Sequence, residues 1–315
     1  MAMGKASRTK QDTDRRARIA AQREAERRAA QRKRIYLAGG SILVVAIVVV
    51  AIVLVKLNSS PPSAAAAPAG SALTAVEKQV EDVPASVTGK VGAGSVDTSL
   101  FKPTETTTEV SNAASAGNYF GTINGNLMTS GGKPEFLFIG GEYCPYCAAE
   151  RWAMVNALSR FGTLTGLTTI HSSSTDVDPN TPTFSFVNAS YTSKYLNFTP
   201  VEAYGETSSA TLQTPTSAEQ TAWQTYDPNG AIPFLDFGDK YVEVGNLAPL
   251  DPSQLSGKSY SQIAAAMASP SGSTVGTNED LNANYITAAI CKLTNNQPST
   301  ACTPTIQKLQ SSFAS

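Results

Sequence analysis

The stretch Glu135-Phe-Leu-Phe-Ile-Gly-Gly-Glu-Tyr-Cys144-Pro-Tyr-Cys147-Ala-Ala-Glu-Arg-Trp152 decides how the chain folds. It opens with a short apolar run, which is typical of a buried strand, and two glycines end that run. Two cysteines three residues apart follow, and Pro145 begins a segment with helical spacing. A strand, a sharp turn, two thiols and a helix together favour reversible dithiol–disulfide chemistry.

The order of the residues in this motif predicts their roles. Cys144 should stand at the amino end of the helix, where unpaired backbone N–H groups and the helix dipole stabilise a thiolate. Pro145 suits the first helical position because it has no N–H to leave unsatisfied. Cys147 lies one turn further on the same face, with Tyr146 between them, and can resolve a mixed disulfide formed by Cys144. We therefore expect Cys144 to attack, Cys147 to resolve, and Cys144 to be open to outside peptides.

Two other readings of the cysteine pair stay open. The pair could be half of a zinc site, completed by Cys291, Cys302 or the single histidine, His171. It could also be a static disulfide. Charged residues flank the motif as well, and we expect Glu150 and Arg151 on a solvated helix face, with Glu150 as a proton relay to Cys147 as the alternative.

The other two cysteines, Cys291 and Cys302, lie close together in the sequence. Outside the cytoplasm such a pair should be oxidised. Closing so short a loop is worth roughly 3 kcal/mol in the chain-entropy model. We predict a structural disulfide; a second redox relay is the alternative.

Charge is divided unevenly along the chain. Residues 1–34 carry a net charge of +8 and the remaining residues about −9, for a total of −1. An acidic domain is a poor partner for nucleic acid. Hydrophobic residues make up 41% and charged residues 16% of the chain, so a substantial core can form under a surface rich in Ser, Thr, Asn and Gly.

An apolar run follows the basic tail. Residues 35–57 contain no charge before Lys56 and are long enough for a helix that crosses a bilayer. The preceding basic cluster should stay cytoplasmic, which puts the rest of the chain outside the membrane. A cleaved signal peptide is the alternative. Residues 58–75, rich in Ala, Pro and Ser, read as a linker, and residues 76–315 as the extracytoplasmic domain.

The cysteine motif and a second element together resemble the thioredoxin superfamily. Ile232-Pro233 stands directly before two apolar runs joined by Gly238-Asp239, which predict a hairpin. The resemblance implies an α/β thioredoxin-like fold with a cis-proline loop that faces the cysteines. The Ile232 backbone would then pair with a substrate peptide. An ordinary trans proline at a strand edge is the alternative.

A wider resemblance covers roughly residues 75–312. The segment Tyr143-Cys-Pro-Tyr-Cys-Ala-Ala-Glu-Arg-Trp152, with residues 158–162, 172–176, 180–184 and 191–195, resembles an uncharacterised domain-of-unknown-function family, DUF929, of archaeal and actinobacterial membrane-anchored proteins. Two features depart from thioredoxin. Phe138 stands where many thioredoxins have a buried acid, and the interval between Cys147 and Pro233 is long enough to hold an insertion at about residues 172–230.

These observations converge on one functional hypothesis. We expect a single-pass thiol–disulfide oxidoreductase that acts on cysteine-containing exported proteins without a cofactor or metal, with a membrane partner to recycle it. Centres with Pro-Tyr between the cysteines resemble glutaredoxins, whose potentials of about −200 to −230 mV favour oxidase or isomerase duty. A non-enzymatic cell-surface module with a structural disulfide, or a thiol carrier in metal or haem maturation, would fit the same residues.

Overall fold

The computed structural model describes residues 63–92, 101–103, 119–123, 125–245 and 250–313. The predicted basic tail (1–34), the predicted membrane span (35–57) and the first residues of the linker lie outside the described residues. Among the helices that the structure describes, none combines the length and hydrophobicity that a transmembrane segment needs.

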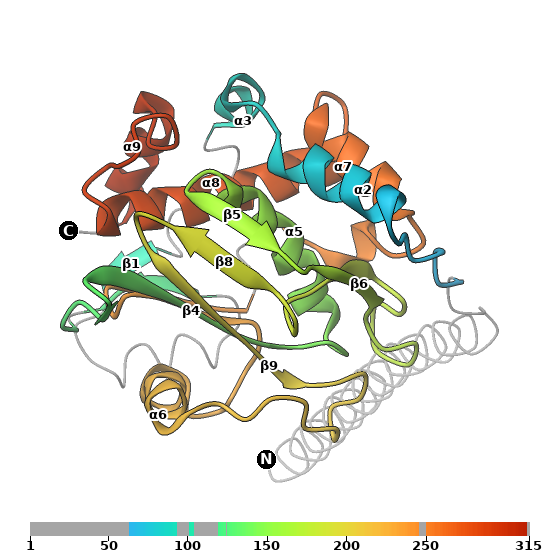
Figure 1. Cartoon of the computed structure of the whole chain (residues 1–315), viewed down its shortest axis with the longest axis horizontal. Helices are drawn as coiled ribbons and strands as arrows, with labels where there is room; N and C mark the ends of the chain where they lie inside the picture. Colours follow the sequence, from blue (N-terminus) through green and yellow to red (C-terminus); the bar gives the residue numbers. More distant parts are fainter. Residues whose placement is uncertain (1–62, 93–100, 104–118, 124, 246–249, 314–315) are drawn as a thin grey trace, which may run out of the picture. The chain divides into compact units, whose positions relative to one another are not determined.

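A mixed seven-stranded sheet forms the centre of the domain (Figure 1). Its strands run in the order β1-β2-β11-β10-β4-β3, and β9 pairs with β4. At the middle of the sheet, β4 is antiparallel to β10 and parallel to β9. The bounds are β1 Phe101–Pro103, β2 Tyr119–Thr122, β3 Thr129–Ser130, β4 Lys133–Gly141, β9 Asn197–Tyr204, β10 Phe234–Phe237 and β11 Tyr241–Val244.

The apolar run of β4 is continuous because both faces of the sheet are covered. Phe136 and Phe138 belong to one hydrophobic cluster, which includes Trp152 of the helix after the cysteines. Leu137 and Ile139 belong to a second cluster on the other face. The strand that sequence analysis predicted here is therefore confirmed, and it ends at Gly141, just before the cysteine motif.

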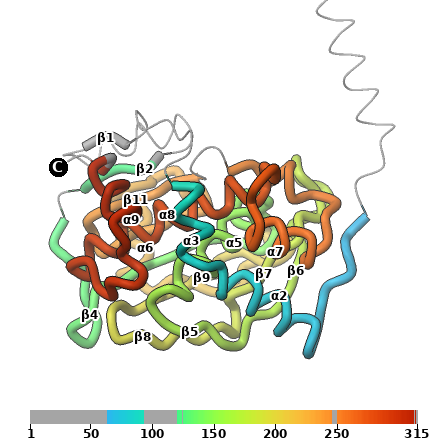
Figure 2. The backbone as a smooth tube through the Cα atoms, turned by 90° about the horizontal axis from the view of Figure 1, so that it is seen from above, coloured from blue at the N-terminus to red at the C-terminus, as the bar shows by residue number. Residues whose placement is uncertain are grey.

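Helices cover the two faces of the sheet unequally. Helices α5, α8, α7 and α2 lie on one side, and α6 lies on the other (Figure 1). Viewed from above, α2 lies beside α7 (Figure 2). The bounds are α2 Ser71–Glu81, α3 Ala85–Val91, α5 Pro145–Ser159, α6 Ser217–Tyr226, α7 Tyr260–Ala268, α8 Thr274–Leu293 and α9 Pro304–Leu309, with short 3₁₀ turns at Pro252–Gln254 and Gln310–Ser312.

Two small antiparallel ladders follow α5. Strand β5 (Gly162–Thr165) pairs with β8 (Ser190–Ser193), and β6 (Thr168–His171) pairs with β7 (Pro182–Ser185). The main sheet then regains a strand at β9. This corrects the predicted insertion at 172–230, because that interval contains β9, a strand of the main sheet that pairs in parallel with β4. The strand escaped prediction because Pro200 and Glu202 interrupt its apolar pattern.

Two further boundaries test the expectations from the sequence. The hairpin before residue 245 is confirmed: β10 and β11 are antiparallel, and Gly238 and Asp239 at its turn both have positive φ, as tight hairpin turns require. The linker predicted at 58–75 is too long at its end, because α2 begins at Ser71 and buries Val76 and Val80.

Candidate redox site

The site lies where β4 passes into α5. Cys144 is the N-cap of the helix, with an extended backbone at φ −79° and ψ 121°, and Pro145 takes the first helical position. The Cys147 backbone N–H donates to Cys144 Sγ over 3.2 Å. A side chain that accepts from the third helical residue is the usual N-cap contact, here made by sulfur in place of oxygen. The helix begins at the residues that the sequence predicted.

The loop before β10 lies against the first cysteine. Cys144 Sγ is 3.9 Å from the carbonyl oxygen of Ile232, to which the thiol donates. The Ile232–Pro233 peptide bond is cis, as expected. The structure therefore brings the cysteine pair and the Ile232-Pro233 loop together, although Cys144 and Ile232 are 88 residues apart in the sequence.

Access to the two sulfurs differs from what the sequence suggested. Both cysteines are free thiols, and both are buried: 5% of Cys144 is exposed and none of Cys147. Tyr146, between them, is 42% exposed and marks the surface above the pair. The expectation that Cys144 is openly accessible is therefore wrong for most of its surface, because the loop at Ile232 covers the thiol.

The environment separates the two thiols in acidity. The pKa of Cys144 is lowered, first by the hydrogen bond from the Cys147 side chain and then, against the effect of burial, by the Cys147 backbone N–H and the charge of Arg151. The pKa of Cys147 is raised well above its ordinary value, chiefly by burial. Cys144 is thus the thiol that ionises first, which is the property of an attacking cysteine.

Beneath the pair lies an ion pair that sequence analysis missed. Arg151 donates to Glu202 through both Nε (2.9 Å to Oε1) and Nη2 (2.6 Å to Oε2). Both side chains are fully buried, as is Glu150, so the expected solvated helix face is wrong. The face is buried because α5 is packed against α8, α2 and the two small ladders, and Arg151 reaches Glu202 on β9.

Part of this arrangement has a signal in the sequence. Arg151 follows Cys144 by seven residues and therefore lies on the same helix stripe as Cys144 and Cys147. Its partner has none, because Glu202 stands on β9, fifty-one residues later. The pairing becomes visible only when β9 takes its place beside β4.

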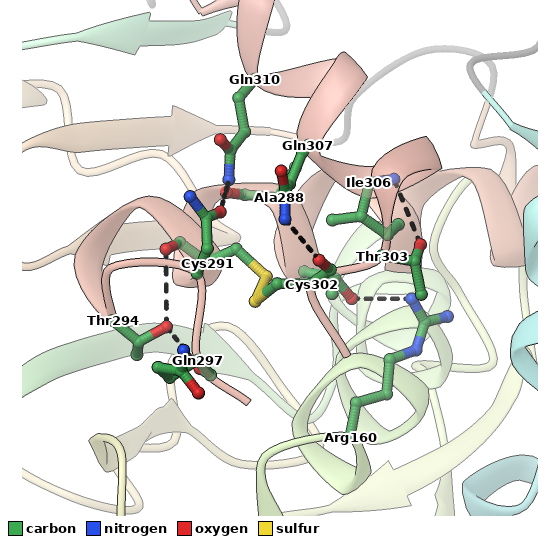
Figure 3. Close-up of a disulfide and its surroundings, with 12 residues drawn as sticks. Arg160, Ala288, Cys291, Thr294, Gln297, Cys302, Thr303, Ile306, Gln307 and Gln310 are labelled. Atoms are coloured by element: carbon green, nitrogen blue, oxygen red, sulfur yellow. Dashed lines mark hydrogen bonds between the residues drawn. A yellow bond between two sulfur atoms is a disulfide. The ribbon is translucent and has the colours of Figure 1, made fainter. Parts of the chain in front are cut away.

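The second cysteine pair lies on another part of the domain. Cys291, near the end of α8, and Cys302, before α9, form a disulfide with Cα atoms 5.7 Å apart, as predicted (Figure 3). Gln307 Nε2 donates to the Cys302 carbonyl over 2.8 Å, which fastens α9 to the same loop. Because the two sulfurs are bonded to each other, they supply no thiolate ligands to a metal.

Comparison with known proteins identifies the family. The model of the family described as Domain of unknown function (DUF929) matches residues 119–292, more than half of the chain and including the cysteine motif, Glu202 and the Ile232-Pro233 loop. The chain belongs to this family. Neither a curated protein nor a solved structure matches it.

Proposed function

We propose that this DUF929 protein is a thiol–disulfide oxidoreductase with a thioredoxin-like fold. The arrangement of four strands supports the fold. Strands β4 and β9 are parallel and are connected through α5, and β10 and β11 form an antiparallel hairpin. In the order β11-β10-β4-β9, strand β4 lies between the hairpin and β9. The cysteine pair follows β4, and the Ile232-Pro233 loop precedes the β10–β11 hairpin; this arrangement resembles that of thioredoxin.

One observation carries the activity. Two reduced thiols share the amino end of α5, and their environments shift their pKa values in opposite directions. A pair in which one thiol ionises readily and its neighbour keeps its proton suits a nucleophile and a resolving group. A disulfide that only held the fold together would need no such difference.

The exchange balances without a cofactor. When the pair is oxidised, a substrate thiolate attacks Cys144 Sγ, the Cys144–Cys147 bond breaks, and Cys147 leaves and takes up a proton. A second thiolate of the substrate then attacks the substrate sulfur that is bonded to Cys144, which releases Cys144 as a thiolate. The substrate gains one disulfide and the protein gains two electrons; reduction of a substrate follows the same steps in reverse.

We place this activity outside a membrane. The support is the charge-free run that begins at residue 35 and the basic tail before it, which together are typical of a single-pass anchor with its amino end in the cytoplasm. Exported proteins with cysteines are then the substrates within reach. The electrons gained in substrate oxidation would pass to a redox partner in the same membrane.

The test uses the full chain in detergent. The Cys144–Cys147 couple is equilibrated with glutathione buffers, and the protein is assayed for oxidative refolding of reduced, scrambled ribonuclease A. We expect a reversible couple and activity that Cys144→Ser abolishes, with Cys147→Ala trapping mixed disulfides on Cys144. A pair that cannot be reduced, or activity unchanged in Cys144→Ser, would return the protein to the class of non-enzymatic surface modules.

A further inference from the structure

The ion pair beneath the cysteines also contacts the backbone around it, because Glu202 Oε1 accepts from the Phe186 N–H over 3.2 Å. Arg151 and Glu202 are fully buried and joined by two hydrogen bonds. Removing two charges from water is costly, and replacing a buried pair by apolar residues of similar volume often leaves a protein as stable or more so. Retaining both charges so close to the thiols therefore points to a role in thiol chemistry.

Gly141 connects the guanidinium to both cysteines. Its carbonyl oxygen accepts from Arg151 Nη2 over 3.0 Å and from the Cys144 backbone N–H over 3.2 Å. Its own backbone forms a hydrogen bond with the Cys147 side chain. A Cβ at this position would meet atoms of Ile232, Tyr143 and Tyr204 at 3.1 Å each, so the space beside Gly141 is tight. The guanidinium thus holds in place a residue whose backbone contacts both cysteines.

The guanidinium also has bonding capacity that Glu202 does not use. Arg151 Nη1 is buried and has no hydrogen-bond partner among the described residues. Its positive charge acts on both sulfurs: after the contacts from Cys147, it lowers the pKa of Cys144, and it opposes the effect of burial on Cys147. In a buried site, where water does not screen charges, such an interaction is much stronger than at a surface.

We propose that Arg151 is the positioning residue of the redox site: held by Glu202 and bound to Gly141, it supplies the fixed positive charge that stabilises the Cys144 thiolate. Glu202 has two opposed effects, because it fixes the guanidinium in place and partly neutralises it. The inference deepens the proposed function, since it names the group that keeps the attacking sulfur ionised.

Removing the charge of Arg151 and removing the charge of Glu202 should therefore change the reactivity of Cys144 in opposite directions. We would measure the pH dependence of Cys144 alkylation by iodoacetamide in the reduced full chain in detergent, with residue-resolved mass spectrometry. Arg151→Met should slow the reaction near pH 7 about tenfold. Glu202→Gln, which leaves the guanidinium unneutralised, should accelerate it, and the double variant should return to within about threefold of the unmodified protein.

The two tyrosines beside the cysteines do not obscure this readout, because burial raises the pKa of Tyr143 and of Tyr146. Burial, and then the charge of Cys144, raise the pKa of Tyr143 to about 12, so this tyrosine stays neutral over the tested range. Arg160, the C-cap of the same helix, provides the matched control. It donates to Thr287 and Asn156 at the far end of α5, and Arg160→Met should leave the alkylation profile unchanged.

The outcomes separate a role in thiol chemistry from a structural one. The proposal would be overturned if Arg151→Met and Glu202→Gln changed the rate of Cys144 alkylation equally and in the same direction, or if neither changed it. If Arg151→Met does not fold, Arg151→Lys replaces it as the test, because it keeps the positive charge. Its alkylation rate must stay within about threefold of that of the unmodified protein, and the rate of Glu202→Gln must rise. Alkylation does not depend on turnover, so opposite shifts in a protein that refolds no substrate would refute the proposed function and leave this inference standing.

Discussion

The two cysteine pairs of this protein show how the surrounding chain decides what sulfur does. Cys144 and Cys147 stand at the start of α5, unbonded to each other, with a guanidinium below and a carbonyl beside them. Cys291 and Cys302 join the end of α8 to the segment before α9, bonded and buried. Both pairs are sealed from most solvent, so exposure does not distinguish them.

What distinguishes the pairs is the presence of groups that stabilise one ionised sulfur. The first pair has a helix N-terminus, a neighbouring thiol and a buried cation. Around the second pair, Gln307 and Gln310 donate to the backbone carbonyls of Cys302 and Ala288 (Figure 3). Figure 3 also shows Thr303 Oγ1 accepting from the Ile306 N–H and a hydrogen bond of the Arg160 guanidinium. The first environment suits a reactive thiolate, and the second suits a cross-link. The predictions below test that division.

The largest effect should come from removing the attacking sulfur. Cys144→Ser should lower the rate of disulfide exchange by at least about 1,000-fold, because a hydroxyl at this position does not ionise near neutral pH. The measurement is the turnover of reduced ribonuclease A by the full chain. Cys302→Ser is the matched control, and a comparable loss of turnover in that variant, once it is shown to be folded, would erase the distinction between the pairs.

Stability should show the reverse ranking. Cys291→Ala with Cys302→Ala opens a short loop and should cost roughly 3 kcal/mol. In a domain of this size that corresponds to a fall of about 6–12 °C in the melting temperature. Thermal unfolding followed by circular dichroism would measure it. We expect Cys144→Ala with Cys147→Ala to change the melting temperature by less than about 3 °C, and a larger change there would assign a structural role to the first pair too.

The sequence predicted the first pair better than its surroundings, and the reason is the range of the interactions. The strand, the glycines, the N-cap cysteine and Pro145 are all determined within a few residues, so β4 and the start of α5 are visible in one stretch. The same holds for the hairpin at Gly238-Asp239, whose turn needs positive φ at adjacent residues.

Features that depend on distant segments could not be predicted in this way. Strand β9 carries Pro200 and Glu202 at positions that an alternating pattern would reserve for apolar side chains, and it is recognisable only through its pairing with β4. Glu202 becomes acceptable in the interior because Arg151 reaches it from another element. For the same reason, the burial of Cys144 depends on the Ile232 loop and not on the motif itself.

The reactivity of the two sulfurs within the first pair should also differ. Because Cys144 has a lowered pKa and Cys147 a raised one, Cys144 should react with iodoacetamide at least tenfold faster at pH 7 in the reduced protein. Residue-resolved mass spectrometry after timed quenching gives both rates in one sample. The unfolded protein in urea is the control, in which both cysteines should react at similar rates. Faster labelling of Cys147 in the folded protein would reverse the assigned roles.

The smallest effect is a dependence of stability on pH that only the first pair can produce, since bonded sulfurs do not titrate. The pKa of Cys144 is lower in the folded protein than in the unfolded chain, where it is about 8.5. The stability that Cys144 contributes is therefore complete above about pH 8.5 and is lost as the pH falls through the pKa of the folded state. Cys147 has a raised folded pKa, so it destabilises the protein as the pH rises above about 8.5. Relative to Cys144→Ser with Cys147→Ser, the reduced protein should therefore be most stable near about pH 8.5. Melting temperatures across that range would show the maximum, and Cys147→Ser alone should keep the rise and lose the fall. A difference that does not vary with pH would mean that the two thiols have ordinary and equal pKa values in the fold, and the first pair would then differ from the second only in being unbonded.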